Sequence, residues 1–432
     1  MTLTFYWTDI LVWISFAVGL ILYLIKRHSP IIQDIKITLV QKPRYMVALL
    51  IVTTFTVIGL LDSIHLSYKS NGLNVTRSVL DLILSPRDYQ REKTYSAPFA
   101  LRSFEEETTA GEGGTTREMY AGLKYAGVGI EKGSSKGIDI LKRVSLGFIS
   151  GFILWCLLYL PFRQSTRRKM TEHRVIRAFE ITLFCVFCWI TLSAALMFQY
   201  HIFGTDKIGR DVYYIVLKSI RTGLVIGTVT SFVMLPFALS MGIWAGYFRG
   251  WIDDAIQYLY TTLGSIPGVL LIAAAVLSFQ IRIEEDPDLK LLLLCIVLGA
   301  TGWIGLCRLL RGETLKLREE NYVQAARTLG VSDFKILLKH ILPNLMHIVI
   351  ITVVIDFSGL VLAESVLSYV GVGVAPTTYS WGNMINAARL EMAREPMVWW
   401  SLVAAFIFMF TLVFSTNILG DALQQALNPR ER

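Results

Sequence analysis

Long apolar runs separated by short polar segments form the dominant pattern of this chain. A helix needs about 17–25 predominantly apolar residues to cross the hydrocarbon core of a bilayer. Nine runs approach or reach this length, the first being marginal and the seventh short. The predicted spans are residues 10–25, 45–64, 144–162, 178–198, 222–246, 255–280, 289–306, 346–370 and 399–420.

Composition supports a membrane protein. Of the 432 residues, 54% are hydrophobic and only 17% are charged, and the mean hydropathy is +0.53. Soluble domains carry about 25% charged residues, so an ordinary soluble protein is excluded. We therefore predict an all-α polytopic membrane protein. Five cysteines, an odd number, do not indicate a disulfide framework. Cys185 and Cys188 lie within an apolar run, so we interpret them as small buried residues.

The net charge of +8 is explained by topology. Lys and Arg concentrate in the short segments that lie inside if the N-terminus is outside and the C-terminus is cytoplasmic. The basic stretch 163–169 anchors the inner side, and the acidic stretch 284–288 suits an outer turn. A nucleic-acid partner is therefore not expected. We also expect no cleaved signal peptide, because no basic residues precede the first apolar run.

The polar segment 65–143 is the one large insertion between predicted spans. Its Gly/Thr-rich composition predicts a partly ordered extracytoplasmic loop, with a short helix near residues 75–84 that Pro86 ends. The predicted organisation is a two-span N-terminal extension, this loop or small domain, an extra span with a basic linker, and a membrane core. These parts correspond to residues 1–64, 65–143, 144–177 and 178–425.

The inner segment 311–344 predicts two short helices joined at a glycine. The first carries an apolar face and stops at Gly330, a residue suited to the left-handed conformation that ends many helices. Ser332 is placed to cap the second helix, and Pro343 is expected to end it. Ala325 and Ala326 are small enough to let another protein approach closely. We interpret the segment as a contact site for a partner.

Two other interpretations of segment 311–344 exist. Its Ala-Ala-x-x-x-Gly pattern also occurs in DNA-binding helix-turn-helix motifs, but attachment to the bilayer at both ends prevents docking in a major groove. An ordinary cytoplasmic loop is also consistent with the same residues.

The motifs of this segment and of several others resemble those of one family. Gln324-Ala-Ala-x-x-x-Gly330, followed by His340-Ile-Leu-Pro-Asn344, resembles the EAA motif of ABC importer permeases. Stretches at 203–211, 246–253, 363–373, 380–384 and 419–429 are similar to the dipeptide, oligopeptide and nickel branch of that family, in the same order. The resemblance covers roughly residues 178–430.

The resemblance implies a type I permease core of six spans behind an extension of about three spans. It implies a multi-pass subunit of a bacterial inner-membrane importer for di- or oligopeptides that is not itself an enzyme. Its partners would be a second homologous permease, two cytoplasmic ATP-binding subunits that hold ATP and Mg²⁺, an extracytoplasmic substrate-binding protein and the lipid bilayer. No cofactor is expected in this chain, which has no phosphate-binding G-x-x-x-x-G-K-[ST] motif.

Two sets of site residues follow. The resemblance assigns the coupling to the ATPases to a helix within 311–344, although Gln324 stands where the family usually has Glu. The coupling residues are Gln324, Ala325, Ala326, Gly330, Ser332, Asp333 and Pro343. Charged groups inside a span or at its outer mouth are costly and often functional. The candidates for a translocation path or gate are therefore Asp356, Glu364, Asp206, Arg210 and Asp211.

Residues 209–221 predict a short interfacial helix on the outer surface, with Val212, Ile215, Val216 and Ile220 on one face. The six histidines show no metal-ligand spacing, so no metal site is expected. An ion-coupled secondary transporter that uses Asp356 and Glu364 is an alternative function. Nickel or another small solute is an alternative substrate, and a membrane scaffold built on loop 65–143 is a third class.

Overall fold

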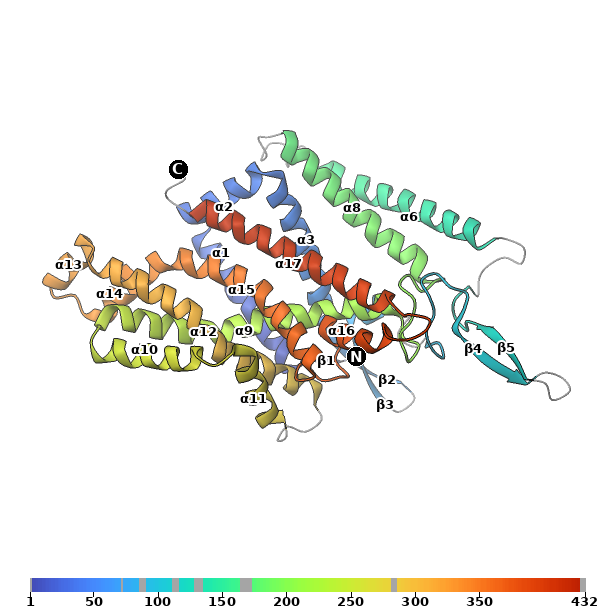
Figure 1. Cartoon of the computed structure of the whole chain (residues 1–432). Helices are drawn as coiled ribbons and strands as arrows, with labels where there is room; N and C mark the ends of the chain where they lie inside the picture. Colours follow the sequence, from blue (N-terminus) through green and yellow to red (C-terminus); the bar gives the residue numbers. More distant parts are fainter. Residues whose placement is uncertain are drawn as a thin grey trace. The chain divides into compact units, whose positions relative to one another are not determined.

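The computed structural model describes residues 2–70, 73–84, 91–110, 116–127, 135–163, 173–280 and 286–427 (Figure 1). Outside these ranges lie most of the basic stretch 163–169, part of the Gly/Thr-rich region, Glu284 and Glu285 of the acidic turn, and the last residues of the C-terminal motif. The long helices are α1 (Trp7–Lys26), α3 (Pro43–Asp62), α6 (Lys136–Tyr159), α8 (His173–Met197), α9 (Val212–Phe248), α12 (Pro287–Arg318), α15 (Leu342–Val370) and α17 (Trp400–Leu427).

Shorter elements connect the long helices. The short helices are α2 (Pro30–Gln41), α4 (Val79–Ile83), α10 (Trp251–Gly264), α11 (Gly268–Gln280), α13 (Asn321–Thr328), α14 (Asp333–Ile336) and α16 (Trp381–Glu391), with a 3-10 turn η1 (Leu160–Phe162) and a π-helical turn η2 (Leu337–Ile341). The strands are β1 (Thr2–Thr4), β2 (His65–Ser70), β3 (Leu73–Ser78), β4 (Arg102–Ala110) and β5 (Thr116–Gly122).

The helices match the predicted spans. Within the described residues, eight helices are long and apolar enough to cross a membrane, and the bent pair α10–α11 would be a ninth. The all-α membrane architecture is thus confirmed. The span predicted at 289–306 is part of a longer helix, because α12 continues to Arg318.

The span predicted as one helix at 255–280 is broken. α10 and α11 meet at an angle of 87° across Ser265, Ile266 and Pro267. Pro267 has no backbone N–H to continue the hydrogen-bond ladder of α10, which explains why the apolar run does not form one straight helix.

The insertion contains more regular structure than a loop. β1, β2 and β3 form an antiparallel sheet in that order, and β4 and β5 form a separate hairpin. The helix predicted at 75–84 is shorter, because residues up to Ser78 belong to β3 and only α4 is helical. A reciprocal capping box between Ser78 and Asp81 begins α4.

The chain divides into two compact units that do not follow the chain order. The first contains residues 1–5, 39–222 and 379–415, and the second contains 6–38, 223–378 and 416–432. Each unit therefore combines residues of the N-terminal region with residues of the core. The boundaries of the four predicted sequence domains stay a prediction.

In the first unit, α6 and α8 lie against each other at very short range (Figure 1). A Cβ added to Gly147 would lie 2.9 Å from Cα of Leu192, and one added to Gly151 would lie 2.9 Å from Cα of Cys188. The Thr191 hydroxyl also donates a hydrogen bond to the Gly147 carbonyl (2.8 Å). This small-x-x-x-small packing is typical of helices that associate in membranes.

A buried ion cluster joins α3, α4 and α9 in the same unit. The Lys218 ammonium donates to carboxylate oxygens of Asp62 (2.7 Å) and Asp81 (2.8 Å) and to the Ser78 hydroxyl (3.2 Å). The Tyr214 hydroxyl donates a further bond to Asp81 (2.8 Å). All three ammonium hydrogens can therefore be used in a site that excludes water.

The electrostatics of the cluster favour charged partners. Burial raises the pKa of the Asp81 carboxyl, but the Lys218 ammonium and several hydrogen bonds outweigh it and hold the pKa below its usual value. The cluster therefore binds the N-terminal region to the first turns of α9 through charge as well as packing.

The short interfacial helix predicted at 209–221 is wrong. Residues 212–221 are instead the first part of the long helix α9, and Val212, Ile215, Val216 and Ile220 are at most 5% exposed. Their apolar face is covered by protein, as the hydrogen bond from the Trp381 indole N–H to the Val216 carbonyl (3.2 Å) illustrates. An apolar stripe on a helix end predicts burial but does not identify whether protein or lipid provides it.

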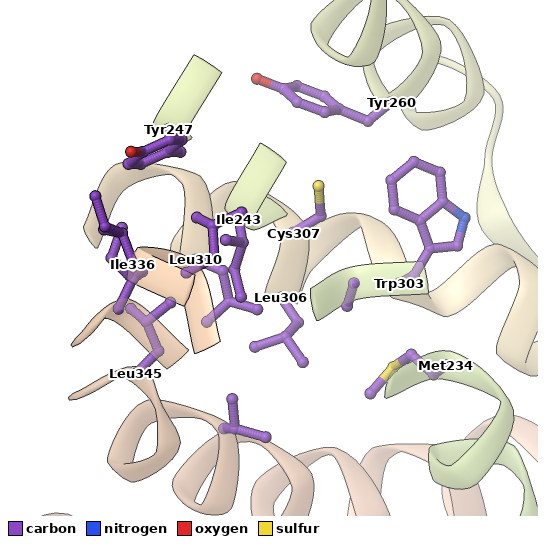
Figure 2. Packing of buried hydrophobic residues seen from close by; sticks show 14 of the residues in the cluster. Met234, Ile243, Tyr247, Tyr260, Trp303, Leu306, Cys307, Leu310, Ile336 and Leu345 are labelled. Atoms are coloured by element: carbon purple, nitrogen blue, oxygen red, sulfur yellow. The ribbon is translucent and has the colours of Figure 1, made fainter. Parts of the chain in front are cut away.

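The second unit has a continuous hydrophobic cluster. It joins α9, α10 and α12 to the segment after α12, with Tyr247, Leu310 and Ile336 close together (Figure 2). Gly246 allows α9 and α12 to approach, since a Cβ there would lie 2.6 Å from the Thr314 side chain. Arg311 of α12 also pairs with Asp253 of α10 through two bonds of 2.6 and 2.7 Å.

Replacing Gly151 with leucine is expected to destabilise the α6–α8 pair by about 1–3 kcal/mol, because the added side chain must force the two backbones apart. Thermal unfolding of the detergent-purified protein measures this change. Gly137→Leu is the matched control, since a Cβ at Gly137 meets nothing within 4 Å. Equal stability of the two variants would contradict close packing at Gly151.

Replacing Lys218 with methionine is expected to cost about 3–5 kcal/mol, because it leaves two buried carboxylates without their cation. Adding Asp62→Asn and Asp81→Asn to the same chain should restore much of the lost stability by removing those charges. Unfolding temperatures of the single and triple variants test this. A Lys218→Met protein as stable as the unchanged chain would contradict the role of the cluster.

Candidate functional site

The predicted coupling segment folds as a helix, a tight turn and a second helix. α13 ends at a turn in which Gly330 has φ +74°. The Gly330 N–H donates to the Arg327 carbonyl and the Val331 N–H to the Ala326 carbonyl, both at 3.1 Å. This pair of bonds is the Schellman motif, so the sequence-based assignment of a left-handed glycine at this helix end is confirmed.

Two local predictions around this turn are corrected. Ser332 occupies the N-cap position of α14, but its side chain makes no capping hydrogen bond. Pro343 does not end the second helix, because α14 continues through η2 into α15 without a break. Pro343 lies in the first turn of α15, where a missing N–H is tolerated, and the π-helical turn precedes it.

The predicted coupling residues point in different directions. Gln324 is exposed and its amide donates to the Arg318 carbonyl (3.3 Å) and to Glu319 (3.4 Å). Ala325 is exposed, whereas Ala326 is buried in the hydrophobic cluster. Only one of the two alanines is therefore available on the surface of the segment.

The segment is firmly attached to the core of its unit. The Tyr247 hydroxyl of α9 donates to the Asp333 carboxylate (2.5 Å), and the Arg318 guanidinium donates to the Tyr247 carbonyl (2.8 Å). Figure 2 shows Ile336 beside Tyr247 within the same cluster. A force on α13 or α14 would therefore reach α9 and α12 directly.

Around the turn, two large apolar side chains are exposed. Leu329 is 82% exposed and Phe334 is 72% exposed, and they flank Gly330 on either side. This turn lies between the span of α12 and the apolar part of α15. Both apolar side chains are therefore available to contact another molecule.

Asp206, Arg210 and Asp211, which were predicted to lie at the outer mouth of the path, form a closed loop rather than a set of free charges. The Arg210 side chain pairs with Asp206 (2.8 Å), and Asp206 also accepts the Arg210 N–H (2.8 Å). Asp211 accepts the N–H groups of Tyr213 (2.9 Å) and Tyr214 (3.2 Å) and so caps α9. Each of these three charged side chains therefore makes contacts that hold the loop and the start of α9 in place.

A buried histidine lies between two carboxylates in this loop. His201 Nδ1 is 2.6 Å from Asp211 and Nε2 is 3.4 Å from Glu92. Burial raises the pKa of the Glu92 carboxyl, but hydrogen bonds from His201 and from the N–H groups of Lys124 and Tyr125 outweigh it and place the pKa below its usual value. An imidazolium satisfies both contacts, because each ring nitrogen then donates.

The insertion supplies the other half of this loop. The Glu92 N–H donates to the Gly209 carbonyl (3.0 Å), the Phe99 N–H to the His201 carbonyl (2.9 Å), and the Thr205 N–H to the Ser96 carbonyl (3.1 Å). Gly204 lies so close that a Cβ there would be 2.2 Å from the Ser96 carbonyl oxygen. Residues 92–99 are therefore part of the structure around the loop that precedes α9.

Asp356 and Glu364 lie on α15, about 80° apart around the helix axis. Glu364 is 3% exposed and accepts a hydrogen bond from the Ser368 hydroxyl (2.6 Å). Asp356 is half-buried and makes no hydrogen bond or ion pair with any residue in the described ranges. Of the two carboxylates, Asp356 is thus the one with unused acceptors inside a span.

The compact units separate the predicted path residues. Asp206, Arg210 and Asp211 belong to the first unit, and Asp356 and Glu364 belong to the second together with the coupling segment. Residues 2–427, outside the gaps given above, contain no group of three His, Cys, Asp or Glu side chains arranged to hold a metal ion.

Lys218 and His201, which belong to buried polar clusters, and Arg308, an exposed cation of α12, were not predicted from the sequence. Lys218 and Arg308 are basic residues inside helices that are long enough to span a membrane, and such a position is itself a signal. The predicted spans 222–246 and 289–306 stop short of these two cations, because α9 and α12 extend beyond their apolar runs.

Comparison with known proteins identifies a family. Residues 238–432 match the family described as binding-protein-dependent transport system inner membrane component. The oligopeptide transport system permease protein OppC of Haemophilus influenzae is 33% identical over 245 residues, which cover 56% of this chain and 75% of that protein.

Two further relatives agree. The dipeptide transport system permease protein DppC of Bacillus subtilis is 31% identical over 232 residues, which cover 54% of this chain and 69% of that protein. The glutathione transport system permease protein GsiD of Escherichia coli O157:H7 is 31% identical over 286 residues, which cover 62% of this chain and 91% of that protein. The chain therefore belongs to the ABC importer permeases, the inner-membrane components of binding-protein-dependent transport systems.

Proposed function

We propose that this chain is one of two permease subunits of an ATP-driven importer of di- or oligopeptides. The three relatives are named for oligopeptide, dipeptide and glutathione transport, and all three substrates are peptides. Alternating access would move the substrate, with the energy supplied by differential binding of the ATPases to two states of the permease.

The exposed turn at Gly330 is the observation that carries the proposal. Leu329 and Phe334 present apolar surface outside the membrane-spanning part of α15, and the cluster below them reaches α9 and α12. A partner that binds this turn can move three helices of the unit together. We assign this partner as one of the two ATP-binding subunits.

The remaining parts of the assembly follow from this assignment. ATP and Mg²⁺ would be bound by the two ATPase subunits, a second homologous permease would complete the path, and an extracytoplasmic protein would deliver the peptide. The proposed orientation has the N-terminus outside and the C-terminus in the cytoplasm, which puts Gly330 on the side of the ATPases.

Asp356 is the proposed contact for the peptide ammonium group. It lies within a candidate span, is half-buried and has no partner among the described residues. A carboxylate in this environment favours a cation as its ligand. Glu364 already accepts a bond from Ser368, so we assign it a structural role.

The alternatives receive less support. An ion-coupled transporter would not need an exposed apolar turn joined to the core, and none of the three relatives is named for nickel transport. The scaffold hypothesis does not account for the unused carboxylate within α15.

Replacing Phe334 with alanine is expected to abolish most peptide uptake while the permease remains folded, because Phe334 is 72% exposed and stabilises its own chain little. Co-purification of the ATPase subunits should fall in parallel. Lys335→Ala, a change at an exposed residue about 100° from Phe334 around the same helix, is the control. Normal uptake and normal ATPase retention in Phe334→Ala would contradict the assignment.

Replacing Gly330 with alanine is expected to cost about 1–3 kcal/mol through strain at φ +74°, and to lower uptake because the two helices can no longer meet at the same angle. Gly305→Ala is the control, since Gly305 is helical with open space around it. Peptide uptake and ATPase stimulation in proteoliposomes measure the loss of transport in the two variants. Identical transport by the two variants would show that the turn does not set the coupling geometry.

Replacing Asp356 with asparagine is expected to lower uptake of a peptide with a free amino terminus about tenfold, which corresponds to the loss of one charge-assisted contact. Uptake of the N-acetylated form of the same peptide should change little. Glu364→Gln serves as the comparison at a satisfied carboxylate. If Asp356→Asn lowers uptake of both peptides by the same factor, Asp356 does not bind the ammonium group.

A further inference from the structure

An apolar groove lies between three of the candidate spans in the first unit. It has a volume of about 310 Å³ and is lined by residues of α3, α8 and α17, all of which belong to that unit. Phe55 and Phe408 are at most 7% exposed and form its floor, with their ring centres 6.1 Å apart. Cys185 and Ile407 also line the groove and are exposed, so the groove is open on this side.

The groove belongs to the membrane-spanning part of the unit. Its lining residues come from the central parts of α3 and α8 and from the first half of α17. Each of these helices is long and apolar enough to cross a membrane, and none of the ten lining residues carries a charge. The open side of the groove therefore faces the hydrocarbon chains of lipid or an apolar surface of another subunit.

Three threonines line the groove without making it polar. Thr54, Thr182 and Thr411 each donate a hydroxyl hydrogen bond to the carbonyl oxygen four residues earlier in its own helix, at 2.7 to 2.8 Å. Each hydroxyl therefore uses its single hydrogen within its own helix. A polar ligand finds no unused hydroxyl donor on these walls, and apolar cavities do not hold water. A hydrocarbon chain matches the groove because it needs no hydrogen-bond partner.

The size of the lining side chains favours a lipid chain over a helix of another subunit. Helices that associate in membranes usually meet through small residues, as α6 and α8 do at Gly147 and Gly151. The groove is lined by no glycine or alanine, and Trp189 and Phe408 contribute large rings whose centres lie 6.1 Å apart. A narrow, flexible chain can follow such walls, whereas a helix about 10 Å wide would contact only the rim.

We propose that this groove binds one hydrocarbon chain of a membrane phospholipid. The inference does not depend on which solute the permease carries. Lipid tails are as apolar as the groove, so close packing against three helices holds the chain rather than the exclusion of water. The volume is at the lower end of the range for ligand sites, about 300–1,000 Å³, which suits a single chain. The bound chain fills the space between α17 and the pair α3 and α8.

The test measures access to Cys185 in the complete transporter with an unchanged sequence. The transporter is freed of lipid phosphate in a detergent that has a rigid ring system in place of an alkyl chain. N-cyclohexylmaleimide then labels the thiols, and peptide mass spectrometry follows each cysteine separately. Palmitoyl-oleoyl phosphatidylcholine at about ten times its Kd should slow labelling of Cys185 about tenfold, because only about a tenth of the grooves stay empty. Labelling of Cys156 on α6, which does not line the groove, should not change.

The other outcomes of the labelling test overturn the proposal. Labelling of Cys185 that phosphatidylcholine does not slow would show that no chain enters the groove. Equal slowing of Cys185 and Cys156 would show a general effect of lipid on the micelle. Protection by glycerophosphocholine, which has the same headgroup and no chains, would show that the headgroup binds instead. Slow labelling of Cys185 before lipid is added would show that another subunit covers the groove.

A variant that fills the groove gives a second measurement. Val186 lines the groove from α8, so Val186→Phe should remove one retained phospholipid from the transporter in native mass spectrometry. Ile181→Phe is the matched control, because Ile181 is 60% exposed and lies about 90° from the groove residues around the same helix. Equal numbers of retained phospholipids in the two folded variants would overturn the proposal. If Val186→Phe does not fold, the labelling of the unchanged chain decides.

Discussion

The absence of water from the bilayer core is the constraint on which this structure depends. A charge placed within a span must find a partner inside the protein or face a polar path. Lys218 has two carboxylates, Arg311 has Asp253, and Glu364 has the Ser368 hydroxyl. Asp356 differs from these groups because the described residues leave it without a counter-charge.

The sequence predicts the parts of this fold that depend on local patterns. Apolar runs located the spans, and one glycine at the end of α13 identified the left-handed turn. Contacts between distant residues were not predictable, because Lys218 pairs with Asp62 and Asp81, which lie 156 and 137 positions away. Arg308 and Arg311 are alike in sequence and less than one helical turn apart, and only the packing of α10 shows that one is paired and the other is not.

The N-terminal region is integrated with the permease in a way that the family resemblance does not describe. Asp62 and Asp81 neutralise a cation of α9, and residues 92–99 form hydrogen bonds with the loop that precedes α9. The first unit therefore cannot be divided into an added module and an independent core. The loop before α9 is hydrogen-bonded to the insertion, so the extra residues contribute to the structure of the permease itself.

The unbroken run from α14 through η2 into α15 has a mechanical consequence. Its 38 residues extend about 57 Å at 1.5 Å per residue, and the Gly330 turn lies immediately before one end. If the run tilted as a rigid rod about that end, a tilt of about 5° would displace the far end by about 5 Å. The π-helical turn, a type of irregularity that often lies at functional sites, is near the Gly330 end of this run. Bending at this turn would reduce the displacement that reaches Glu364.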